Sequence, residues 1–377
     1  MLRYWEAIML KKLISKKADE MNVSGVRKMF EAASKLKDPI DLSVGQPDFD
    51  VPDIIKDEAK KAIDMGLNKY VPTKGMVELR NKIRSKLQEK NGITVDIENI
   101  FVTSAGSGAL TLAFASILDK DDEIIIFDPY FVAYEQLAIL NEAKPIFVET
   151  NNDFSLNFEY LKKAITKKTK AIILNTPGNP TGYVFTKKEL TELVNICKEN
   201  DLIIISDEMY EDFIYDHKHF SVGSIYEKTI SIFGFSKSHS MTGWRVGYFT
   251  APKDIIDAAT KISQFTFVCA PTPFQYACIK AVDHDMKKYV DEYKEKRDFL
   301  YDSLKDKYEF EKPEGAFYAF IKYPYDPKRF INDCLDKNLL VVPGNVFSKK
   351  NTHFRISFAV CDETLKKATS ILNRLVK

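Results

Sequence analysis

The sequence predicts an α/β protein: a large domain with a mostly parallel seven-stranded sheet flanked by helices, plus a smaller α+β domain. Three observations support this prediction. Between about residues 100 and 250, short apolar runs alternate with stretches of mostly helical length and periodicity, a pattern typical of a parallel sheet covered on both faces. After residue 253 the pattern becomes mainly helical, and a second, mixed unit follows. With 377 residues, of which 45% are hydrophobic, the chain can form two or three domains with a sizeable core.

The elements are expected in the following order. Before the large sheet come a helix at 24–37 that Ser24 caps, a strand at 40–44, and helices at 53–65 and 76–90. The seven strands of the large sheet are expected at 100–103, 123–127, 145–148, 170–175, 202–206, 229–233 and 246–250. The second unit should contain a long charged helix at 285–306, strands at 316–321, 339–342 and 354–357, and helices at 326–337 and 362–375.

These elements predict two domains and a shared N-terminal segment. We place a large domain at 51–285 and a small C-terminal α+β domain at 286–377, with the boundary in the long charged helix. Residues 1–50 should pack with the small domain. Because ligands of such sheets bind at the carboxyl ends of the strands, we expect the functional residues in the loops that follow them.

The composition argues against several classes of protein. The formal net charge is +1, and lysines interleave with acidic residues, which argues against a nucleic-acid surface. No apolar run is long enough to span a membrane, and the basic start lacks the apolar segment of a signal peptide. The five cysteines include no C-x-x-C pair, so we expect reduced thiols in a cytoplasmic protein.

The most informative stretch is SIFGFSKSHSMTGWRVGY, at 231–248. An apolar run ends there at Ser236 and Lys237, which places the lysine at the mouth of the sheet. A desolvated lysine amine can lose its proton and attack a carbonyl carbon. Arg245 carries a permanent charge and a planar fork that suits a phosphate. A solvated surface lysine is the simpler alternative in a chain with 55 lysines and arginines, so other motifs must support the functional interpretation.

A carboxylate follows another strongly apolar strand, in the stretch IIISDEMY. Asp207 needs a partner there, which could be Lys237 or Arg245 in a structural ion pair. The functional alternative is a carboxylate that keeps a heterocyclic nitrogen protonated. Tyr210, three residues on, could bind a phenolic oxygen of the same ring.

Two loops predict ligand contacts at other strand ends. TSAGSG, at 103–108, is a small Gly-rich turn before a helix, which suits either an ordinary capped helix or a phosphate. It lacks the third glycine of a dinucleotide fingerprint, and the chain has no P-loop. NTPGNPTG, at 175–182, forms a rigid loop, in which the amide of Asn179 could donate to a ligand oxygen.

Four further side chains have a structural and a functional interpretation. Phe131 could stack on a flat ring or belong to the core. Arg355 lies in an apolar strand and needs an anion, either a structural carboxylate or a substrate carboxylate held bidentately. His217 and His219 look like a metal pair, but no acidic or thiol ligand has suitable spacing. We therefore expect solvated loop histidines and no metal site.

The assembled motifs resemble those of the class I pyridoxal-phosphate-dependent aminotransferases, which share the aspartate aminotransferase fold (fold type I). From about Ser24 to the C-terminus they occur in family order: GQPDF, YVPTKG, the Gly-rich turn, NTPGNPTG, SDEMYE, SKSHSMTGWRVGY, PEGAFY and RISFA. The resemblance implies an enzyme that uses pyridoxal 5'-phosphate. Such an enzyme moves the amino group of an L-amino acid (aspartate, aromatic or similar) to a 2-oxo acid, with 2-oxoglutarate as the expected acceptor, by a ping-pong mechanism.

The resemblance also implies a role for each matching residue. Lys237 would bind the cofactor covalently and then move the substrate's α-proton, Asp207 would pair with the ring nitrogen, and Tyr210 would bind the phenolic oxygen. These three are the expected catalytic residues. The expected cofactor contacts are Ala105, Gly106, Ser107, Phe131, Asn179, Asp207, Tyr210, Ser236, Lys237, Arg245 and Tyr70. The expected substrate contacts are Gly45, Asn179 and Arg355.

Three positions refine what the resemblance implies. In this family the tyrosine of the YVPTKG loop reaches the neighbouring subunit's phosphate, so Tyr70 implies a homodimer with active sites at the interface. Gly234 stands where many members have a Ser or Thr on the phosphate, so Ser236 is the expected substitute. Ser107 stands where some aspartate-active relatives carry a lysine for the distal carboxylate, which leaves aspartate, aromatic and aliphatic donors open.

Three other classes of protein compete with this interpretation. A carbon–sulfur β-lyase, or another non-transaminating pyridoxal-phosphate enzyme of the same fold, would share Lys237, Asp207, Tyr210 and Arg355. A regulatory protein that fuses this fold to a DNA-binding module would need more chain than residues 1–23 provide. A nicotinamide dehydrogenase would fit the alternating pattern but lacks its glycine fingerprint here.

Overall fold

A computed structural model describes residues 13–23, 25 and 36–376, so most of the helix expected at 24–37 lies outside the described residues. The centre of the protein is a seven-stranded sheet in the order β2-β8-β7-β6-β5-β3-β4. Within it β8 runs antiparallel to both neighbours, and the other pairs are parallel. Its strands are β2 (Ile100–Thr103), β3 (Glu123–Asp128), β4 (Lys144–Glu149), β5 (Thr169–Asn175), β6 (Ile203–Asp207), β7 (Thr229–Gly234) and β8 (Gly247–Thr250). The predicted mostly parallel sheet is confirmed.

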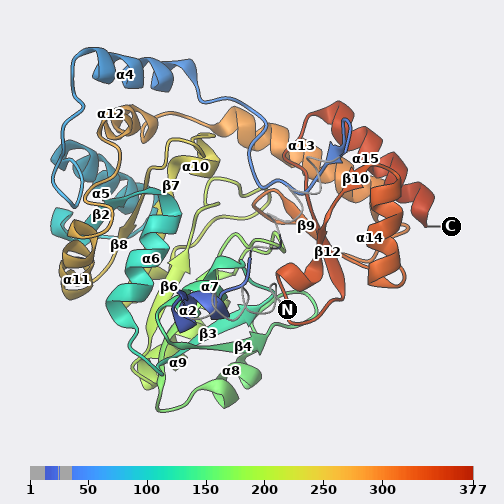
Figure 1. Ribbon diagram of the computed structural model, residues 1–377, viewed down its shortest axis with the longest axis horizontal. Helices are drawn as coiled ribbons and strands as arrows, with labels where there is room; N and C mark the ends of the chain where they lie inside the picture. The colour runs from blue at the N-terminus through green and yellow to red at the C-terminus, as the bar shows by residue number, and fades with distance from the viewer. Residues whose placement is uncertain (1–12, 24, 26–35, 377) are drawn as a thin grey trace.

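Helices cover both faces of this sheet (Figure 1). One face packs against α6 (Ala105–Ile117), α7 (Ala133–Leu140) and α11 (Lys253–Gln264). The other face packs against α4 (Asp53–Asp64), α5 (Val77–Asn91) and α12 (Thr272–Ala281) near β2, and against α8 (Phe158–Ala164) and α9 (Lys187–Glu199) near β5. The central strands are buried on both faces, which is why their sequences are continuous apolar runs rather than alternating ones.

A smaller unit follows at the C-terminal end, drawn in orange and red in Figure 1. Its three-stranded antiparallel sheet has the order β11-β12-β9, and a separate two-stranded sheet pairs β1 with β10. These strands are β1 (Ile40–Asp41), β9 (Tyr318–Lys322), β10 (Leu339–Leu340), β11 (Val342–Pro343) and β12 (His353–Ser357). The helices of this unit are α13 (Lys287–Leu304), α14 (Pro327–Asp336) and α15 (Asp362–Leu375). The remaining short helices are α2 (Lys16–Glu20), α10 (Phe235–Ser238), η1 (Ile97–Asn99), η2 (Val222–Ser224) and η3 (Gly344–Val346).

Two expected strands differ from the structure. The strand expected at 40–44 contains only two residues, because Asp41 Oδ1 accepts hydrogen bonds from the Ser43 N–H at 2.8 Å and the Ser43 hydroxyl at 2.6 Å, which turns the chain. The strand expected at 339–342 is divided, because Leu340 pairs with β1 whereas Val342 pairs with β12. Local hydrophobicity does not specify which partner strand each residue meets.

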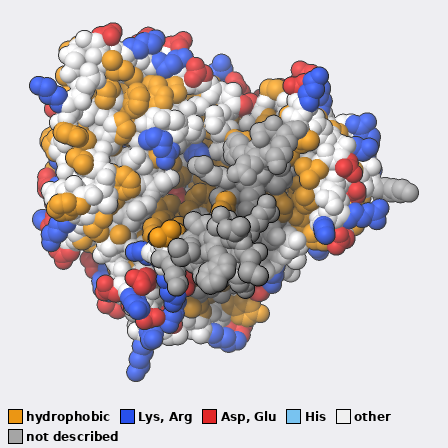
Figure 2. Space-filling model, viewed as in Figure 1, with side chains coloured by type: hydrophobic (Ala, Val, Ile, Leu, Met, Phe, Trp, Pro, Cys, Tyr) orange, Lys and Arg blue, Asp and Glu red, His pale blue; other side chains and the backbone are white. Residues whose placement is uncertain are grey.

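The division of the chain into domains remains our proposal. The pairing of β1 with β10 supports the association of the N-terminal segment with residues 286–377. Figure 2 shows basic and acidic side chains interspersed around the visible face, as the near-neutral charge of the sequence predicts. In the part of the chain that the structure describes, no helix combines the length and the apolar character needed to cross a membrane.

Candidate active site

A cavity of about 320 Å³ lies at the carboxyl ends of the parallel strands and brings most of the expected site residues together. Those that line it are Gly45, Gly106, Ser107, Phe131, Asn179, Asp207, Tyr210, Ser236, Lys237, Arg245 and Arg355. Ala105 is buried beside it, and Tyr70 lies away from it with 84% of its surface exposed. The lining residues that the sequence did not single out are Leu110, Val132, Asn175, Met209, Thr242 and Tyr318.

Lys237 lies in the short helix α10, directly after strand β7. Its Nζ donates a hydrogen bond to the backbone oxygen of Gly45 at 2.6 Å. Burial, and then the charges of Arg355 and Arg245, lower the pKa of Lys237 to about 8. A substantial fraction of the amine is therefore neutral near physiological pH, as a nucleophile or a proton acceptor requires.

Asp207 ends strand β6 and is nearly fully buried. Tyr134 Oη donates to its Oδ2 at 2.6 Å, and the backbone N–H of Met209 donates to its Oδ1 at 3.3 Å. In the described structure no ion pair joins this carboxylate to Lys237 or Arg245, so the partner that we left open is a tyrosine. Burial raises the pKa of Asp207 to about 6, although both hydrogen bonds oppose that rise.

A polar corner at one side of the cavity consists of Ala105, Gly106, Ser107 and Arg245. Arg245 Nη2 lies 3.4 Å from Ser107 Oγ, and Ala105 and Arg245 both have a left-handed backbone, with φ of 62° and 58°. Such a backbone is uncommon outside glycine and occurs often at functional sites. Gly247 closes the corner, because a Cβ there would lie 2.7 Å from Ala105 C and 2.8 Å from Gly106 N. The main chain therefore determines the shape of the corner.

Gly234 has a steric explanation in this structure. A Cβ at this position would lie 2.9 Å from Met209 Cε and 3.3 Å from Gly247 Cα. A serine or threonine therefore does not fit while the Met209 side chain occupies this space. Ser236 lies near by, and its buried Oγ has no hydrogen-bond partner among the described residues, so it is free to bind a ligand.

Arg355, in strand β12, also lines the cavity and is 2% exposed. Its Nη1 donates to Asn179 Oδ1 at 3.0 Å and its Nη2 donates to the Ser43 carbonyl at 2.6 Å. The guanidinium lies 4.5 Å from the ring centres of both Tyr318 and Phe347. In the described part of the chain no carboxylate pairs with it, and Nε has no partner. Of our two alternatives, the structural carboxylate is wrong, and a charge suited to a carboxylate ligand remains.

Two tyrosines of the site were not among the expected residues. Tyr134 belongs to the stretch DPYFVAY, in which only Phe131 was singled out, and Tyr318 ends the PEGAFY motif. Tyr318 Oη lies 2.9 Å from Tyr210 Oη, so these two hydroxyls share a hydrogen bond in the cavity. Their place in the sequence could have identified them, because each tyrosine belongs to a motif in which neighbouring residues lie at the end of a strand.

The prediction of two solvated loop histidines is wrong for His219. His217 is about half exposed, whereas the side chain of His219 is 11% exposed and its Nε2 lies 2.6 Å from a carboxylate oxygen of the fully buried Glu208. The local sequence does not reveal this contact, because the contact forms only when the loop folds back onto the end of β6. Among the described residues no group of three or more metal-ligating side chains occurs.

The chain is similar to known proteins over most of its length. A family model described as aminotransferase class I and II matches residues 37–372. An aspartate aminotransferase of Pyrococcus abyssi is 40% identical over 97% of this chain and 98% of its own. The aromatic-amino-acid aminotransferase 2 of Thermococcus litoralis is 36% identical over 97% and 98%, respectively. The solved structure of a Thermus thermophilus aspartate aminotransferase with maleate has a TM-score of 0.93 at 33% identity, covering 96% of this chain and 99% of that one.

Proposed function

Since this chain belongs to the class I and II aminotransferases, we propose that it transfers the amino group of an L-amino acid to a 2-oxo acid, with 2-oxoglutarate as the acceptor. Aspartate, an aromatic amino acid or a similar amino acid is the donor in this proposal, because relatives named for both classes match equally completely. The observation that carries the proposal is the single cavity lined by the unpaired amine of Lys237 and the buried carboxylate of Asp207.

We propose pyridoxal 5'-phosphate as the cofactor, because the residues of the cavity fit it. The unpartnered hydroxyl of Ser236 and the polar corner with Arg245 suit a phosphate. Asp207 offers a buried carboxylate to a ring nitrogen, and Phe131 offers an aromatic face. When bound, this cofactor supplies an electron-withdrawing ring that makes the α-proton of an amino acid removable.

Lys237 and Asp207 perform the proton chemistry in this proposal. The Nζ of Lys237 accepts the proton from the substrate's α-carbon, which its lowered pKa of about 8 permits near neutral pH. Asp207 must stay ionised to hold a protonated ring nitrogen in place. Tyr134 favours that ionised form by donating to Oδ2.

Arg355 binds the substrate α-carboxylate, with Asn179 and Gly45 beside it. Its guanidinium is already oriented by hydrogen bonds to Asn179 and Ser43, and Nε has no partner among the described residues. In this proposal the same guanidinium serves both substrates. Both substrates carry an α-carboxylate, so the first 2-oxo acid must leave before the second one binds, which supports ping-pong kinetics.

We also propose a homodimer with shared active sites in the cytoplasm. Tyr70 does not line the cavity of its own chain, and the exposed apolar side chains of Ile63 and Met65 lie at the end of the preceding helix α4 and directly after it. Hydrophobic side chains gather over α4 and α12 on the face drawn in Figure 2, a feature typical of a subunit interface. Free thiols at all five cysteines support a reducing compartment.

Absorbance spectra of the purified protein with pyridoxal 5'-phosphate test the proposal. Amino acids are added one at a time without an acceptor. We expect a visible band that a donor bleaches and that 2-oxoglutarate restores. A protein that shows no visible band after incubation with the cofactor would contradict the proposal. A band that persists while pyruvate accumulates would identify the carbon–sulfur β-lyase instead.

A further inference from the structure

A buried polar network lies behind Asp207, on the opposite face of strand β6. Successive side chains of a strand point to opposite faces, so Ser206 and Glu208 point away from the cavity that Asp207 lines. Ser206 Oγ donates to Glu208 Oε1 at 2.9 Å, which confirms that these two side chains share a face. Both residues are fully buried. The charge of Glu208 therefore has no access to water.

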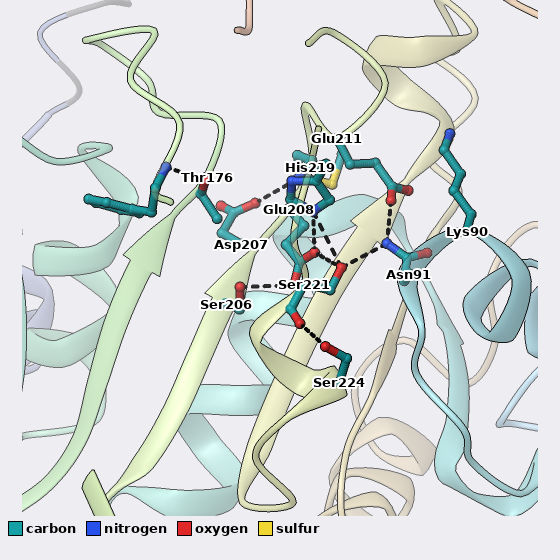
Figure 3. Close-up of polar contacts among 12 residues, drawn as sticks. Lys90, Asn91, Thr176, Ser206, Asp207, Glu208, Glu211, His219, Ser221 and Ser224 are labelled. Atoms are coloured by element: carbon teal, nitrogen blue, oxygen red, sulfur yellow. Dashed lines mark hydrogen bonds and ion pairs between the residues drawn. The ribbon is translucent and has the colours of Figure 1, made fainter. Parts of the chain in front are cut away.

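Both carboxylate oxygens of Glu208 take part in hydrogen bonds. Besides Ser206, the Nε2 of His219 and the hydroxyl of Ser221 both bind Glu208 Oε2. The amide of Asn91 donates to Ser221 Oγ at 2.8 Å, which commits the serine's own proton to Glu208. Figure 3 shows this run of contacts from Ser206 to Asn91. An ionised carboxylate accepts hydrogen bonds on both oxygens, and this set of neighbours suits that role.

His219 is the cation that can neutralise this buried charge. Lys86, the other cation near the network, forms an ion pair with Glu211, which also accepts a hydrogen bond from Asn91 at 2.7 Å. Burial lowers the pKa of His219, but the hydrogen bond and charge of Glu208 outweigh it, so the net shift is upward. When it is protonated, His219 makes a neutral pair with Glu208, to which its Nε2 lies 2.6 Å away.

The state of this pair matters to Asp207 because Glu208 is the next residue in the chain. An uncompensated negative charge on Glu208 disfavours a second negative charge on Asp207. A neutral pair removes that repulsion. The other groups that face Asp207 are Tyr134, the N–H of Met209, Tyr210 and Lys237.

We propose that His219 is a positioning residue for Asp207: it neutralises Glu208 behind β6 and so lets Asp207 keep its negative charge in the cavity. The inference rests on the proposed function, in which the ionised Asp207 holds the ring nitrogen of pyridoxal 5'-phosphate. His219 itself touches neither the cavity nor the reacting atoms.

The test is the pH dependence of pyridoxal 5'-phosphate binding to the full-length protein, followed by absorbance. His219→Gln keeps a donor for Glu208 but removes the positive charge, so the lowest pH that supports binding should rise by about one unit. Glu208→Gln removes the negative charge together with the partner that raises the pKa of His219, so the network again carries no net charge and the limit should stay close to that of the wild type. The double variant should return close to the wild type. A purely structural role would not make the effect of His219→Gln disappear when the charge of Glu208 is removed as well.

Ser221→Ala serves as the matched control, because it removes a neutral donor from the same carboxylate and leaves every charge in place. It should lower the melting temperature without moving the pH limit. If Glu208→Gln does not fold, the direction in which His219→Gln moves the pH limit of binding decides whether the inference holds. The inference is wrong if His219→Gln leaves the limit unchanged or lowers it.

A second readout does not depend on the cofactor. NMR of the full-length protein with labelled aspartate carboxyl carbons follows the titration of Asp207, whose signal is identified by its loss in Asp207→Asn. The pKa of Asp207 should rise in His219→Gln and return close to the wild-type value in the double variant, and an unchanged titration in His219→Gln would overturn the inference. A wild-type protein that binds no cofactor would refute the proposed function alone, and this titration would still decide the role of His219.

Discussion

Two cavities on either side of helix α10 each contain a lysine and an aspartate. The two residues form an ion pair in one cavity but not in the other. In the active-site cavity, Lys237 binds a backbone carbonyl and Asp207 binds a tyrosine hydroxyl. In a second cavity of about 300 Å³, which Phe235 of the same helix lines, Lys90 forms an ion pair with Asp212. Lys90 and Asp212 thus each have an opposite charge beside them, whereas Lys237 and Asp207 form no ion pair in the described part of the chain.

This difference appears in the pKa values. Burial is the largest cause in the active site. Together with the charges of Arg355 and Arg245 it lowers the pKa of Lys237 to about 8, and it raises that of Asp207 to about 6. Burial acts in the same directions on Lys90 and Asp212, but their mutual attraction outweighs it. The pKa of Lys90 is therefore raised, and that of Asp212 is lowered to about 2. Unpaired groups remain able to exchange protons near neutral pH, and paired groups remain charged.

The largest expected effect is that of Lys237→Ala, which removes the unpaired amine. Activity should fall by roughly 10⁴-fold or more, because the nucleophile and the proton acceptor are lost together. The melting temperature should stay constant or rise, since a buried amine without a carboxylate partner carries a desolvation cost. Steady-state kinetics and thermal melts measure the two effects. A variant that loses stability as well as activity would show that Lys237 is paired after all.

The paired region should respond in the opposite way, through stability. Lys86, which also lines the second cavity, pairs with Glu211, and both side chains are largely buried. Lys86→Met should lower the free energy of unfolding by about 3 kcal/mol, because it leaves the Glu211 charge buried and unpaired. Lys82→Met is the matched control on the same helix, since its pair with Asp283 is about half exposed. Lys82→Met should lower the free energy of unfolding by roughly 0.5 kcal/mol or less in denaturant titrations. Equal losses of stability in the two variants would refute the difference between buried and exposed pairs.

In the cofactor-free protein, the ionisation of Asp212 and that of Asp207 should change stability with opposite pH dependence. The folded pKa of Asp212 lies below its ordinary value, so its stabilisation is present above about pH 4 and is lost as the pH falls towards 2. The folded pKa of Asp207 is raised, so its ionisation destabilises the protein increasingly as the pH rises from about 4 through 6. At pH 7, Asp212→Asn should therefore destabilise the fold and Asp207→Asn should stabilise it, each by about 2 kcal/mol. Denaturant titrations at pH 4 and pH 7 measure this, and shifts of the same sign would contradict it.

The smallest effect is expected from Tyr134→Phe, which removes one hydrogen bond from the unpaired carboxylate. The pKa of Asp207 should rise further, and kcat/KM at neutral pH should fall about tenfold. Tyr130→Phe, in the same segment, is the control, because it removes a 2.9 Å hydrogen bond to Glu135 that lies away from Asp207. It should leave kcat/KM unchanged. A wild-type pH profile in Tyr134→Phe would show that this hydroxyl does not support the ionised aspartate.

The positions of the site residues could be predicted from the sequence, but their partners could not. Asp207 and Lys237 directly follow apolar runs, and such runs predict where buried strands end and ligands bind. Tyr134, in contrast, lies 73 residues before the aspartate that it contacts. Nothing in its local pattern indicates which acid it faces. That information depends on how α7 packs on β6, which is a property of the tertiary structure.

His219 shows the same limit more strongly. Its loop is rich in charged residues, and such composition favours solvated side chains. The structure instead buries its ring against Glu208, which lies 11 residues earlier. The strand IIISDE also predicts a buried acid at position 207 but does not reveal that the following acid is buried on the opposite face. Alternation along a strand identifies the two faces, and only the packed fold identifies what covers each one.

The contact between Gly247 and the main chain of Ala105 and Gly106 has a consequence for how such a protein diverges over generations. No larger residue can replace Gly247 without displacing the backbone of the polar corner. Ser107, in the same corner, is exposed and has no comparable restriction. A lineage can therefore exchange the residue at 107 in a single mutational step while the corner keeps its form. Position 247 offers no such step, so we expect inherited variation to accumulate at 107 and to be purged at 247.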